Sequence, residues 1–189
     1  GLKGRGMNCP QLAIGDGAMG FWSALDEVYP QSKQQRCWVH KTANVLNCVP
    51  KSVQPKVKDA LHQIWQADTQ SNAHQAFDRF EQLFAAKYPK AMQCLQKDKD
   101  ELLAFYEFPA MHWQSLRTTN PIESTFSTIR HRTKRAKGCL SRDGMLQMMF
   151  KLGQCAEQNW RRLRGFEDLN KVITGVKFKD GMEIKQNAA

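Results

Sequence analysis

The chain has 189 residues, 41% of them hydrophobic and 24% charged, which is ordinary for one globular domain or for a core that carries an inserted subdomain. Its 28 Lys and Arg residues exceed its 18 Asp and Glu residues, and the net charge of +10 favours a polyanionic partner, although an anionic membrane surface would also satisfy it. No apolar run approaches the ~20 residues of a membrane-spanning helix, and the first residues lack the apolar segment of a signal peptide. The six cysteines have no disulfide-scaffold spacing, which indicates reduced cytosolic thiols.

The first predicted elements surround an acidic residue. Residues 12–14 form a short apolar run, and an amphipathic helical pattern follows over residues 18–28 before it stops at Pro30. Asp16, flanked by two glycines, therefore lies at the carboxyl end of a predicted strand, where α/β folds carry their ligands. A plain Gly-Asp-Gly turn explains the same residues and is the simpler interpretation of Asp16 taken alone.

A second short strand is predicted over residues 36–39, entering His40. Cys37 and His40 have the C-x-x-H spacing of half a zinc site. A structural zinc needs four ligands, and the chain has no second C-x-x-C or C-x-x-H pair. The pattern therefore favours a buried cysteine and a hydrogen-bonded histidine at the end of a strand over a zinc site.

From residue 52 to about residue 106 the sequence predicts only helices. Ser52 and Ser71 are the expected N-caps of two amphipathic helices, the second of which stops at Pro89. Shorter helical patterns cover residues 91–95 and 102–106, and no strand-like alternation interrupts them.

The stretch from residue 118 to residue 139, TTNPIESTFSTIRHRTKRAKGC, is the most informative part of the chain. Asn120 is a suitable N-cap, Pro121 suits the first helical position, and Glu123 lies three residues after the cap. One stripe of this expected helix is apolar and can pack on a core; it consists of Ile122, Phe126 and Ile129.

The same helix becomes strongly basic after its acidic first turn. Glu123 is the one acid between residues 117 and 142, against seven Lys or Arg residues. A lone acid at the head of a phosphate-attracting helix suggests metal-dependent chemistry on nucleic acid, and a capping-box glutamate on a solvated basic helix is the open alternative. The cationic residues expected to meet phosphates are Arg130, Arg132, Lys134, Arg135 and Lys137. A further helix is expected from about residue 146 to residue 163.

Four sequence blocks, taken together, resemble bacterial mutator-type transposases, which are DDE transposases with an RNase H-like catalytic domain. The blocks are GDGAMGFW (15–22), QRCWVHKTANVL (35–46), NPIESTFSTIRHRTKRAKGCLSR (120–142) and MLQMMFKL (145–152). By this resemblance Asp16 is similar to the second acid of the triad and Glu123 to the third. The positions that match the family signature are Cys37, His40 and Asn120.

The resemblance implies an α/β fold, predominantly helical in this chain, in which a partial RNase H-like core is interrupted by an all-helical insertion. Four segments are expected along the chain: 1–48, the central part of the core with the second acid; 49–112, the insertion; 113–165, the return to the core with the third acid and the basic helix; and 166–189, a tail. No Asp or Glu precedes Asp16, whereas the family's first acid lies upstream, so the chain resembles the carboxyl-terminal half of such a transposase.

The function implied is cleavage of DNA at the ends of an insertion element and strand transfer, with Mg²⁺ or Mn²⁺ held by Asp16 and Glu123. Double-stranded DNA and a second transposase copy are the expected partners, in the bacterial cytoplasm and on the nucleoid when DNA is bound. Without the first acid, this chain alone is expected to be inactive. A non-catalytic DNA-binding remnant and a helical protein-interaction module are the alternatives.

Overall fold

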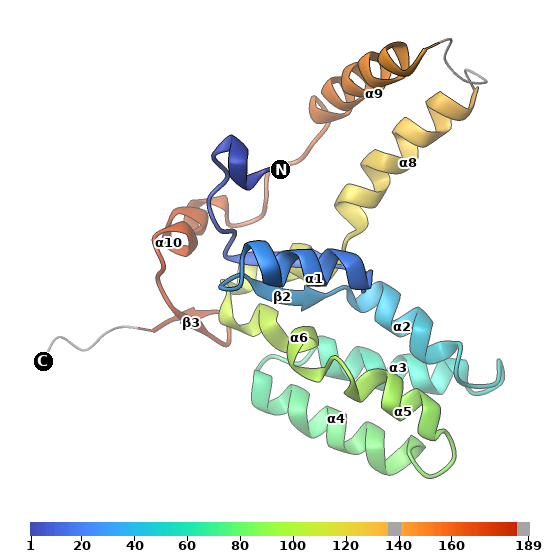
Figure 1. Ribbon diagram of the computed structural model, residues 1–189. Coiled ribbons are helices and arrows are strands. Elements are labelled where there is room, and N and C mark those ends of the chain that lie inside the picture. Colours follow the sequence, from blue (N-terminus) through green and yellow to red (C-terminus); the bar gives the residue numbers. More distant parts are fainter. Residues whose placement is uncertain (136–140, 185–189) are drawn as a thin grey trace, which may run out of the picture. The chain divides into compact units, whose positions relative to one another are not determined.

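We describe the protein from a computed structural model, which describes residues 1–135 and 141–184 (Figure 1). The chain forms two compact units, the first made of residues 1–118 and 164–189 and the second of residues 119–163. Helices predominate and the strands are short, which confirms the predominantly helical α/β class expected from the sequence. The RNase H-like nature of the core and the four-segment division stay predictions.

The elements of the first unit are the strands β1 (Leu12–Gly15), β2 (Lys33–Arg36), β3 (Phe178–Lys179) and β4 (Met182–Glu183), the α-helices α1 (Met19–Val28), α2 (Trp38–Leu46), α3 (Gln54–Trp65), α4 (Gln70–Phe84), α5 (Pro89–Gln96), α6 (Lys99–Leu103), α7 (Trp113–Leu116) and α10 (Leu169–Ile173), and the 3-10 helices η1 (Lys3–Arg5), η2 (Ala104–Glu107), η3 (Ala110–His112) and η4 (Phe166–Asp168). The second unit contains α8 (Asn120–Arg135) and α9 (Arg142–Glu157).

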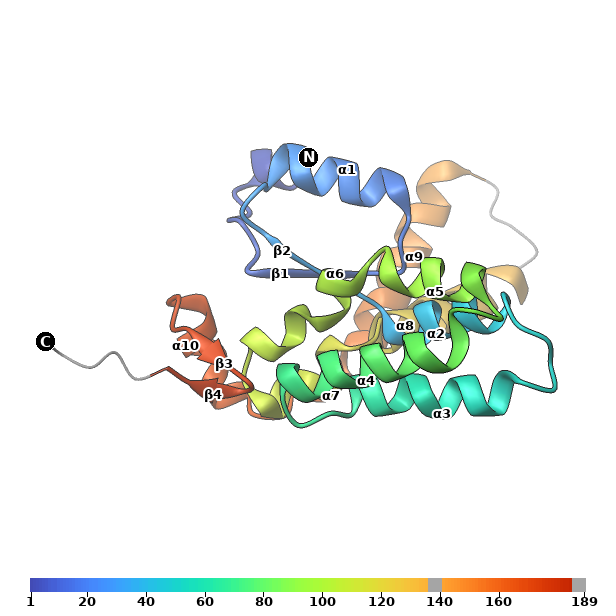
Figure 2. The same cartoon turned by 90° about the horizontal axis from the view of Figure 1, so that it is seen from below.

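Strands β1 and β2 pair in parallel, in a register that places Leu12 beside Lys33 and Gly15 beside Arg36. Helix α1 connects the two strands and runs alongside them (Figure 2). The first strand and first helix are where the sequence predicts them. A β–α–β arrangement of this kind brings the carboxyl ends of both strands to the same edge, and Asp16 follows the first of these ends.

The second strand lies three residues earlier than expected, so the predicted strand at residues 36–39 is wrong beyond Arg36. The chain turns into helix α2 at Trp38, because Trp38, Lys41 and Val45 fall on one buried helical face. A run of four residues was too short to separate a strand from the first turn of a helix.

Helices α2, α3, α4 and α5 pack together and contain most of the hydrophobic core (Figure 2). The fully buried side chains from α3 and α4 include Leu61, Ile64 and Phe80. The expectation that residues 52–106 are helical is confirmed, since no strand occurs in the described residues between Arg36 and Phe178.

The expected caps of these helices are wrong by one or two residues. Helix α3 follows Val53, which makes no side-chain cap, so Ser52 is not its N-cap. Helix α4 is capped by Thr69, whose hydroxyl oxygen accepts a hydrogen bond from the backbone N–H of Asn72 at 3.1 Å, and Ser71 lies inside the helix. Ser ranks above Thr as an N-cap residue, so the sequence alone favoured Ser71 over Thr69.

Strand β2 is tied to the helical core by a buried amide. The Gln35 side chain donates to the carbonyl of Leu102 at 3.2 Å and accepts from the N–H of Phe105 at 2.8 Å. The indole N–H of Trp38 donates to the same Leu102 carbonyl at 2.8 Å. Satisfying these groups allows Gln35 to be fully buried, and it fixes the end of β2 against α6 and η2.

The carboxyl-terminal part of the first unit is a short helix followed by a hairpin, neither of which the sequence assigned. Asp180 and Gly181 connect β3 and β4 with φ angles of 50° and 78°, as a tight hairpin turn requires. Gly181 donates to the carbonyl of Tyr106 at 3.2 Å and accepts from the N–H of Ala110 at 3.1 Å. The hairpin is therefore docked on η2 and η3.

The second unit is a pair of contacting helices. Ser141 caps α9 by accepting from the N–H of Gly144 at 3.0 Å, and α9 ends at Glu157, earlier than the expected residue 163. The apolar stripe expected to pack on a core is only partly confirmed: Ile129 is buried, but Ile122 and Phe126 are exposed. Helical period predicts an apolar face but not whether another element of the chain covers it.

Candidate active site and nucleic-acid interface

Asp16 lies immediately after strand β1, at its carboxyl end, as the sequence predicts. Its side chain is exposed, and one carboxylate oxygen accepts a hydrogen bond from the backbone N–H of Ala18 at 3.1 Å. This is the local hydrogen bond of an Asx turn, so the turn interpretation holds. A carboxylate has about four acceptor positions, and the turn therefore leaves Asp16 able to bind a cation as well.

The glycines on either side of Asp16 are both required by the space around them. A Cβ atom on Gly15 would come within 2.7 Å of the Trp22 ring. A Cβ atom on Gly17 would lie 1.8 Å from the Arg36 guanidinium, and its φ of +106° favours glycine in any case. The loop that presents Asp16 is thus closely packed by α1 on one side and by the end of β2 on the other.

Cys37 directly follows the carboxyl end of β2, and His40 lies in the first turn of helix α2, so the expected buried cysteine and hydrogen-bonded histidine at a strand end are confirmed. Cys37 is the N-cap residue and is almost completely buried, and its Sγ lies 3.2 Å from Nδ1 of His40 in the first turn. The backbone N–H of Cys37 donates to the carbonyl of Gly15 at 2.8 Å. The signature pair is therefore held next to the residue that precedes Asp16. No cluster of three or more His, Cys, Asp or Glu side chains suited to a metal occurs in the described residues.

The polypeptide that leads to α8 starts beside the same strand end. The backbone N–H of Trp38 donates to the carbonyl of Arg117 at 2.8 Å, and Sγ of Cys37 lies 3.9 Å from the hydroxyl of Thr118. These contacts lie within the first unit, of which Thr118 is the last residue before the second unit begins. The exit of the chain toward Glu123 is consequently anchored close to Asp16.

Arg117 is a residue that the sequence did not single out. Its guanidinium lies over the rings of Phe105, Trp113 and Trp65, with distances of 4.4, 5.2 and 5.6 Å to the ring centroids. Burial lowers the pKa of this guanidinium from its usual value. A basic residue in a basic segment suggests a phosphate contact, whereas this arginine stacks on aromatic rings and fixes the chain before α8.

Glu123 lies in the first turn of α8 and is exposed. The hydroxyl of Thr119 donates to its carboxylate, and its own N–H donates to the carbonyl of Thr119 at 3.0 Å. Asn120 is the first residue of α8, so the helix starts about one residue earlier than an Asn120 N-cap requires. Asp16 belongs to the first unit and Glu123 to the second, and a metal site shared by both stays a prediction.

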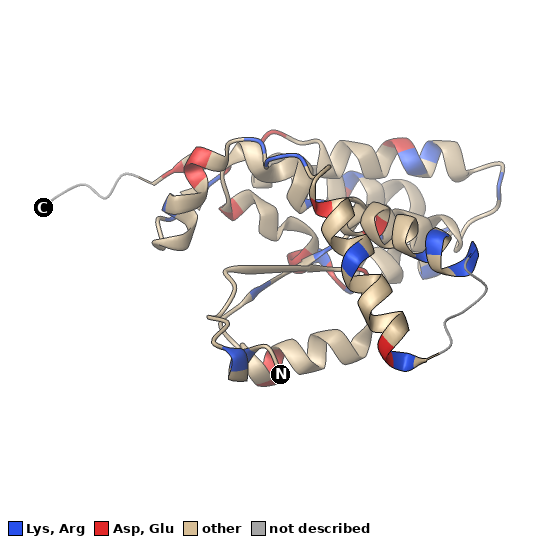
Figure 3. Ribbon diagram, turned by 90° about the horizontal axis from the view of Figure 1, so that it is seen from above, with Lys and Arg blue, Asp and Glu red and all other residues tan. Residues whose placement is uncertain are grey.

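The predicted cationic residues gather on the last two turns of α8, where blue segments precede the grey trace in Figure 3. All of those described are exposed, and none forms an ion pair with another described residue; they are Arg130, Arg132, Lys134 and Arg135. Lys137 lies outside the described residues. Cations at a helix C-terminus also interact favourably with the helix dipole, which is the purely structural account of the same positions.

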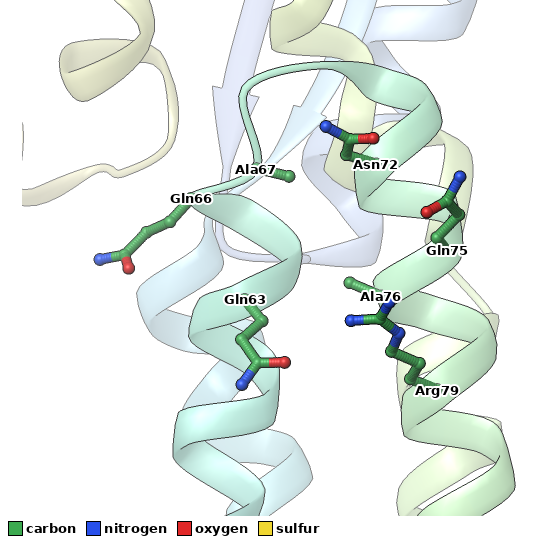
Figure 4. Close-up of a pocket in the computed structure, with 7 residues that line it drawn as sticks. All are labelled: Gln63, Gln66, Ala67, Asn72, Gln75, Ala76 and Arg79. Carbon is green, nitrogen blue, oxygen red and sulfur yellow. The ribbon is translucent and has the colours of Figure 1, made fainter.

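A groove of about 500 Å³ lies between α3 and α4 (Figure 4). Its polar lining consists of amide side chains and one guanidinium, with two alanines: Gln63, Gln66, Asn72, Gln75, Arg79, Ala67 and Ala76. The lining contains no carboxylate, imidazole or thiol, so this groove offers neither the usual metal ligands nor an acid–base pair.

A sequence profile described as "Transposase, Mutator family" matches residues 1–162. The chain belongs to this family. It is 56% identical over 182 residues to the "Transposase for insertion sequence element IST2" of Acidithiobacillus ferrooxidans, an alignment that covers 96% of this chain and 62% of the relative. It is 50% identical over 184 residues to the "Transposase for insertion sequence element IS6120" of Mycolicibacterium smegmatis, covering 97% of this chain and 57% of the relative.

A more distant relative is the "Transposase for insertion sequence element IS905" of Lactococcus lactis, with 33% identity over 134 residues, 71% of this chain and 34% of the relative. The chain thus spans about three fifths of the length of the two more similar Mutator transposases. None of the helices in the described ranges is long and apolar enough to cross a membrane.

Proposed function

We propose that this chain supplies part of the catalytic domain of an insertion-sequence transposase, which cuts donor DNA at the element ends and joins the freed 3′-hydroxyl to target DNA. The observation that carries the proposal is the position of Asp16. It follows a parallel strand at its carboxyl end and lies beside the Cys37–His40 signature, in a chain that belongs to the Mutator family. In this proposal β1, α1 and β2 are part of an RNase H-like core, which residues 49–112 interrupt.

Asp16 and Glu123 would together hold Mg²⁺ or Mn²⁺, because carboxylate oxygens are the hard donors that these cations prefer. When bound, such cations stabilise the attacking and leaving oxygens of an in-line phosphoryl transfer. The anchored exit of the chain supports a shared site, since Glu123 follows Arg117 after only a few residues and each residue spans at most about 3.5 Å.

The exposed cations of α8 would bind phosphates of double-stranded DNA and so set affinity and position, not sequence specificity. Glu123 lies in the first turn of α8, and these cations lie in its last two turns. One DNA segment can therefore contact both. A second transposase copy is the proposed protein partner in the strand-transfer complex.

The shared metal site is tested by Mn²⁺ binding to the full chain, followed by electron paramagnetic resonance. Asp16→Asn and Glu123→Gln should each weaken the same site, and the double variant should lose little more than either single variant, because two ligands of one ion are not additive. Glu27→Gln, an exposed acid on α1, is the matched control. Additive losses, or an effect of Glu27→Gln equal to that of Asp16→Asn, would show that the two acids do not share an ion.

The DNA interface is tested by the salt dependence of binding to a short duplex. Replacing Arg130, Arg132, Lys134 and Arg135 with Ala should flatten the log–log salt slope by about three to four, at roughly 0.9 for each phosphate contact. The control replaces three exposed lysines near the start of α3, which are Lys51, Lys56 and Lys58. A slope that responds to the control set and not to α8 would move the DNA to the helical insertion.

We also propose that the chain alone does not nick DNA, because no acid precedes Asp16 in its sequence. A supercoiled plasmid should stay intact in Mg²⁺ or Mn²⁺. Nicking that Glu123→Gln abolishes would contradict this, and it would mean that another acid completes the site. DNA binding without any metal site would instead favour the non-catalytic DNA-binding function.

A further inference from the structure

Two cations and one carboxylate form a nearly buried cluster between β2, α2 and the segment that joins α5 to α6. Nε of Arg36 donates to Oδ2 of Asp98 at 3.1 Å, and the Lys41 ammonium donates to the same oxygen and to the carbonyl of Cys94 at 2.8 Å. The Lys41 side chain is 3% exposed, so its charge depends on these partners. Burial acts to raise the pKa of Asp98, but the two cations outweigh it and lower the pKa, which keeps Asp98 ionised.

The cluster reaches the Asp16 loop through Arg36. The Nη atoms of Arg36 occupy the space in which a Cβ atom of Gly17 would stand, so the guanidinium lies directly against the backbone next to Asp16. Only Asp98 balances the charge of Arg36 among the ion pairs of the described residues. Without that partner, the guanidinium would be a free cation close to a proposed metal ligand.

We propose that Asp98 is a positioning residue for Asp16, which holds the Arg36 guanidinium against Gly17 and prevents it from pairing with the Asp16 carboxylate. This inference rests on the proposed role of Asp16 as a metal ligand. Its consequence is that the helical insertion takes part in the active site, because the α5–α6 segment sets the shape and the local charge of the loop that carries the acid.

The hydrogen bonds of Asp98 favour a positioning role over a purely structural one. A carboxylate that accepts charge-assisted hydrogen bonds from both Arg36 and Lys41 is held in place, and it restrains the guanidinium through Nε, as outer-shell carboxylates do for the ligands of metal sites. Lys41 also donates to the carbonyl of Cys94, so its ammonium has a second acceptor besides Asp98. Among the ion pairs of the described residues Arg36 has only Asp98, so Asp98 and not Lys41 is the group that restrains the guanidinium.

The test measures Mn²⁺ affinity of the full chain by electron paramagnetic resonance, and the amide NMR signals of Gly17 and Ala18 without metal. Asp98→Asn should weaken Mn²⁺ binding roughly tenfold, the lower end of the range for outer-shell residues, and should shift both amide signals. Asp98→Glu should recover most of the affinity. Glu107→Gln, which breaks the half-exposed ion pair with Lys33 in the same unit, should change neither measurement.

Lys41→Met separates positioning from stability, because it removes the buried charge but leaves the Arg36–Asp98 pair. It should lower the melting temperature and keep Mn²⁺ affinity within about twofold, a change of less than 0.5 kcal/mol. An equal loss of affinity in Lys41→Met and Asp98→Asn would overturn the proposal, as would unchanged affinity in a folded Asp98→Asn.

If Asp98→Asn does not fold, Arg36→Lys provides the same test, because it keeps the charge pair with Asp98 but has no planar group to cover Gly17. It should shift the Gly17 amide and weaken Mn²⁺ binding, and unchanged values would reject the positioning role. If Asp16→Asn does not alter Mn²⁺ binding, the proposed function fails, while the metal-free amide signals still decide whether Asp98 shapes the loop.

Discussion

Helices α2–α5 of the first unit and helix α8 of the second unit are similarly amphipathic but bury their apolar residues very differently. In the first set Leu61 and Phe80 are completely buried, whereas Ile122 and Phe126 of α8 are 60% and 55% exposed. Burial of apolar surface is the main source of stability, so the free energy of unfolding resides in the helices around α3 and α4. Helix α8 instead presents an acid and a row of exposed cations.

This difference separates the part of the chain that stabilises the fold from the part that we propose to bind DNA. Cations that bind phosphate must stay exposed, and they cannot contribute to a core. Asp16 combines features of both parts. Its side chain is exposed, but its loop is held by close packing around Gly15, Gly17 and Arg36. Substitutions that lower stability should therefore fall mainly in the helices of the first unit, and substitutions that lower DNA binding should fall in α8.

The largest expected effect is the removal of a core aromatic ring. Phe77→Ala should reduce the free energy of unfolding by about 3–5 kcal/mol, because Phe77 is 1% exposed and packs against Trp38. Phe126→Ala, the same change on α8, should alter the free energy of unfolding by no more than about 0.5 kcal/mol. Urea unfolding of both variants by circular dichroism gives the comparison. An equal cost for Phe126→Ala would mean that the exposed face of α8 is covered in solution.

A smaller loss of stability, dependent on pH, is expected at the buried cluster. Asp98→Asn should cost up to about 3 kcal/mol at pH 7, because Lys41 is left buried without its carboxylate. The pKa of Asp98 is lowered in the folded protein, so its contribution is complete above its unfolded pKa of about 3.9 and is lost as the pH falls through the lower folded pKa.

The measurement for this cluster is the free energy of unfolding of the wild type and Asp98→Asn between pH 7 and pH 2. The difference between them should be constant above about pH 4 and should shrink below it. Glu107→Gln is the control, since its ion pair with Lys33 is about half exposed and should contribute at most about 1 kcal/mol. A difference that stays constant down to pH 2 would contradict the ion-pair origin.

The sequence predicted the elements that have a long apolar period or that end at a clear turn residue. The strand before Asp16 ends at a glycine turn, and the helices of residues 52–106 have long apolar periods, and both are confirmed. Strand β2 was misplaced because its buried residue is a polar one, Gln35, whose amide is satisfied by backbone groups far along the chain. Apolar alternation could not reveal it.

The site was predicted only in part for a similar physical reason. Asp16 and the Cys37–His40 pair are local patterns, and the structure brings them to one strand end. Arg36 and Asp98 carry no pattern of their own, because their roles depend on tertiary contacts between β2 and the α5–α6 segment. The one available signal was Gly17, since a glycine beside a proposed ligand indicates the close approach of another group.

Two arginines with different predicted roles test the same difference between the two units. Arg117→Ala should reduce the free energy of unfolding by about 2 kcal/mol, because a partly buried cation stacked on Phe105 and Trp113 contributes both packing and cation–π attraction. Arg130→Ala on α8 should leave stability unchanged and lower the DNA salt slope by about 0.9. Unfolding curves and binding titrations on both variants test the pair. A stability loss from Arg130→Ala would mean that the cationic helix is a structural element.

The smallest expected effect concerns the helix caps. Loss of a cap should lower global stability in the first unit but should only increase local opening in the second. Thr69→Ala should cost about 1 kcal/mol of global stability, because the Thr69 hydroxyl caps α4, a helix of the buried core. Ser71→Ala, inside the same helix, should be within about 0.5 kcal/mol of the wild type.

Ser141→Ala removes the equivalent cap of α9, whose residues are not buried, so it should speed hydrogen exchange in the first turn of α9 and leave the urea midpoint unchanged. Hydrogen exchange read by mass spectrometry, together with the urea midpoints, tests all three variants. A midpoint that falls as far for Ser141→Ala as for Thr69→Ala would show that α9 unfolds cooperatively with the core, and the division between a stabilising and a DNA-facing region would then be wrong.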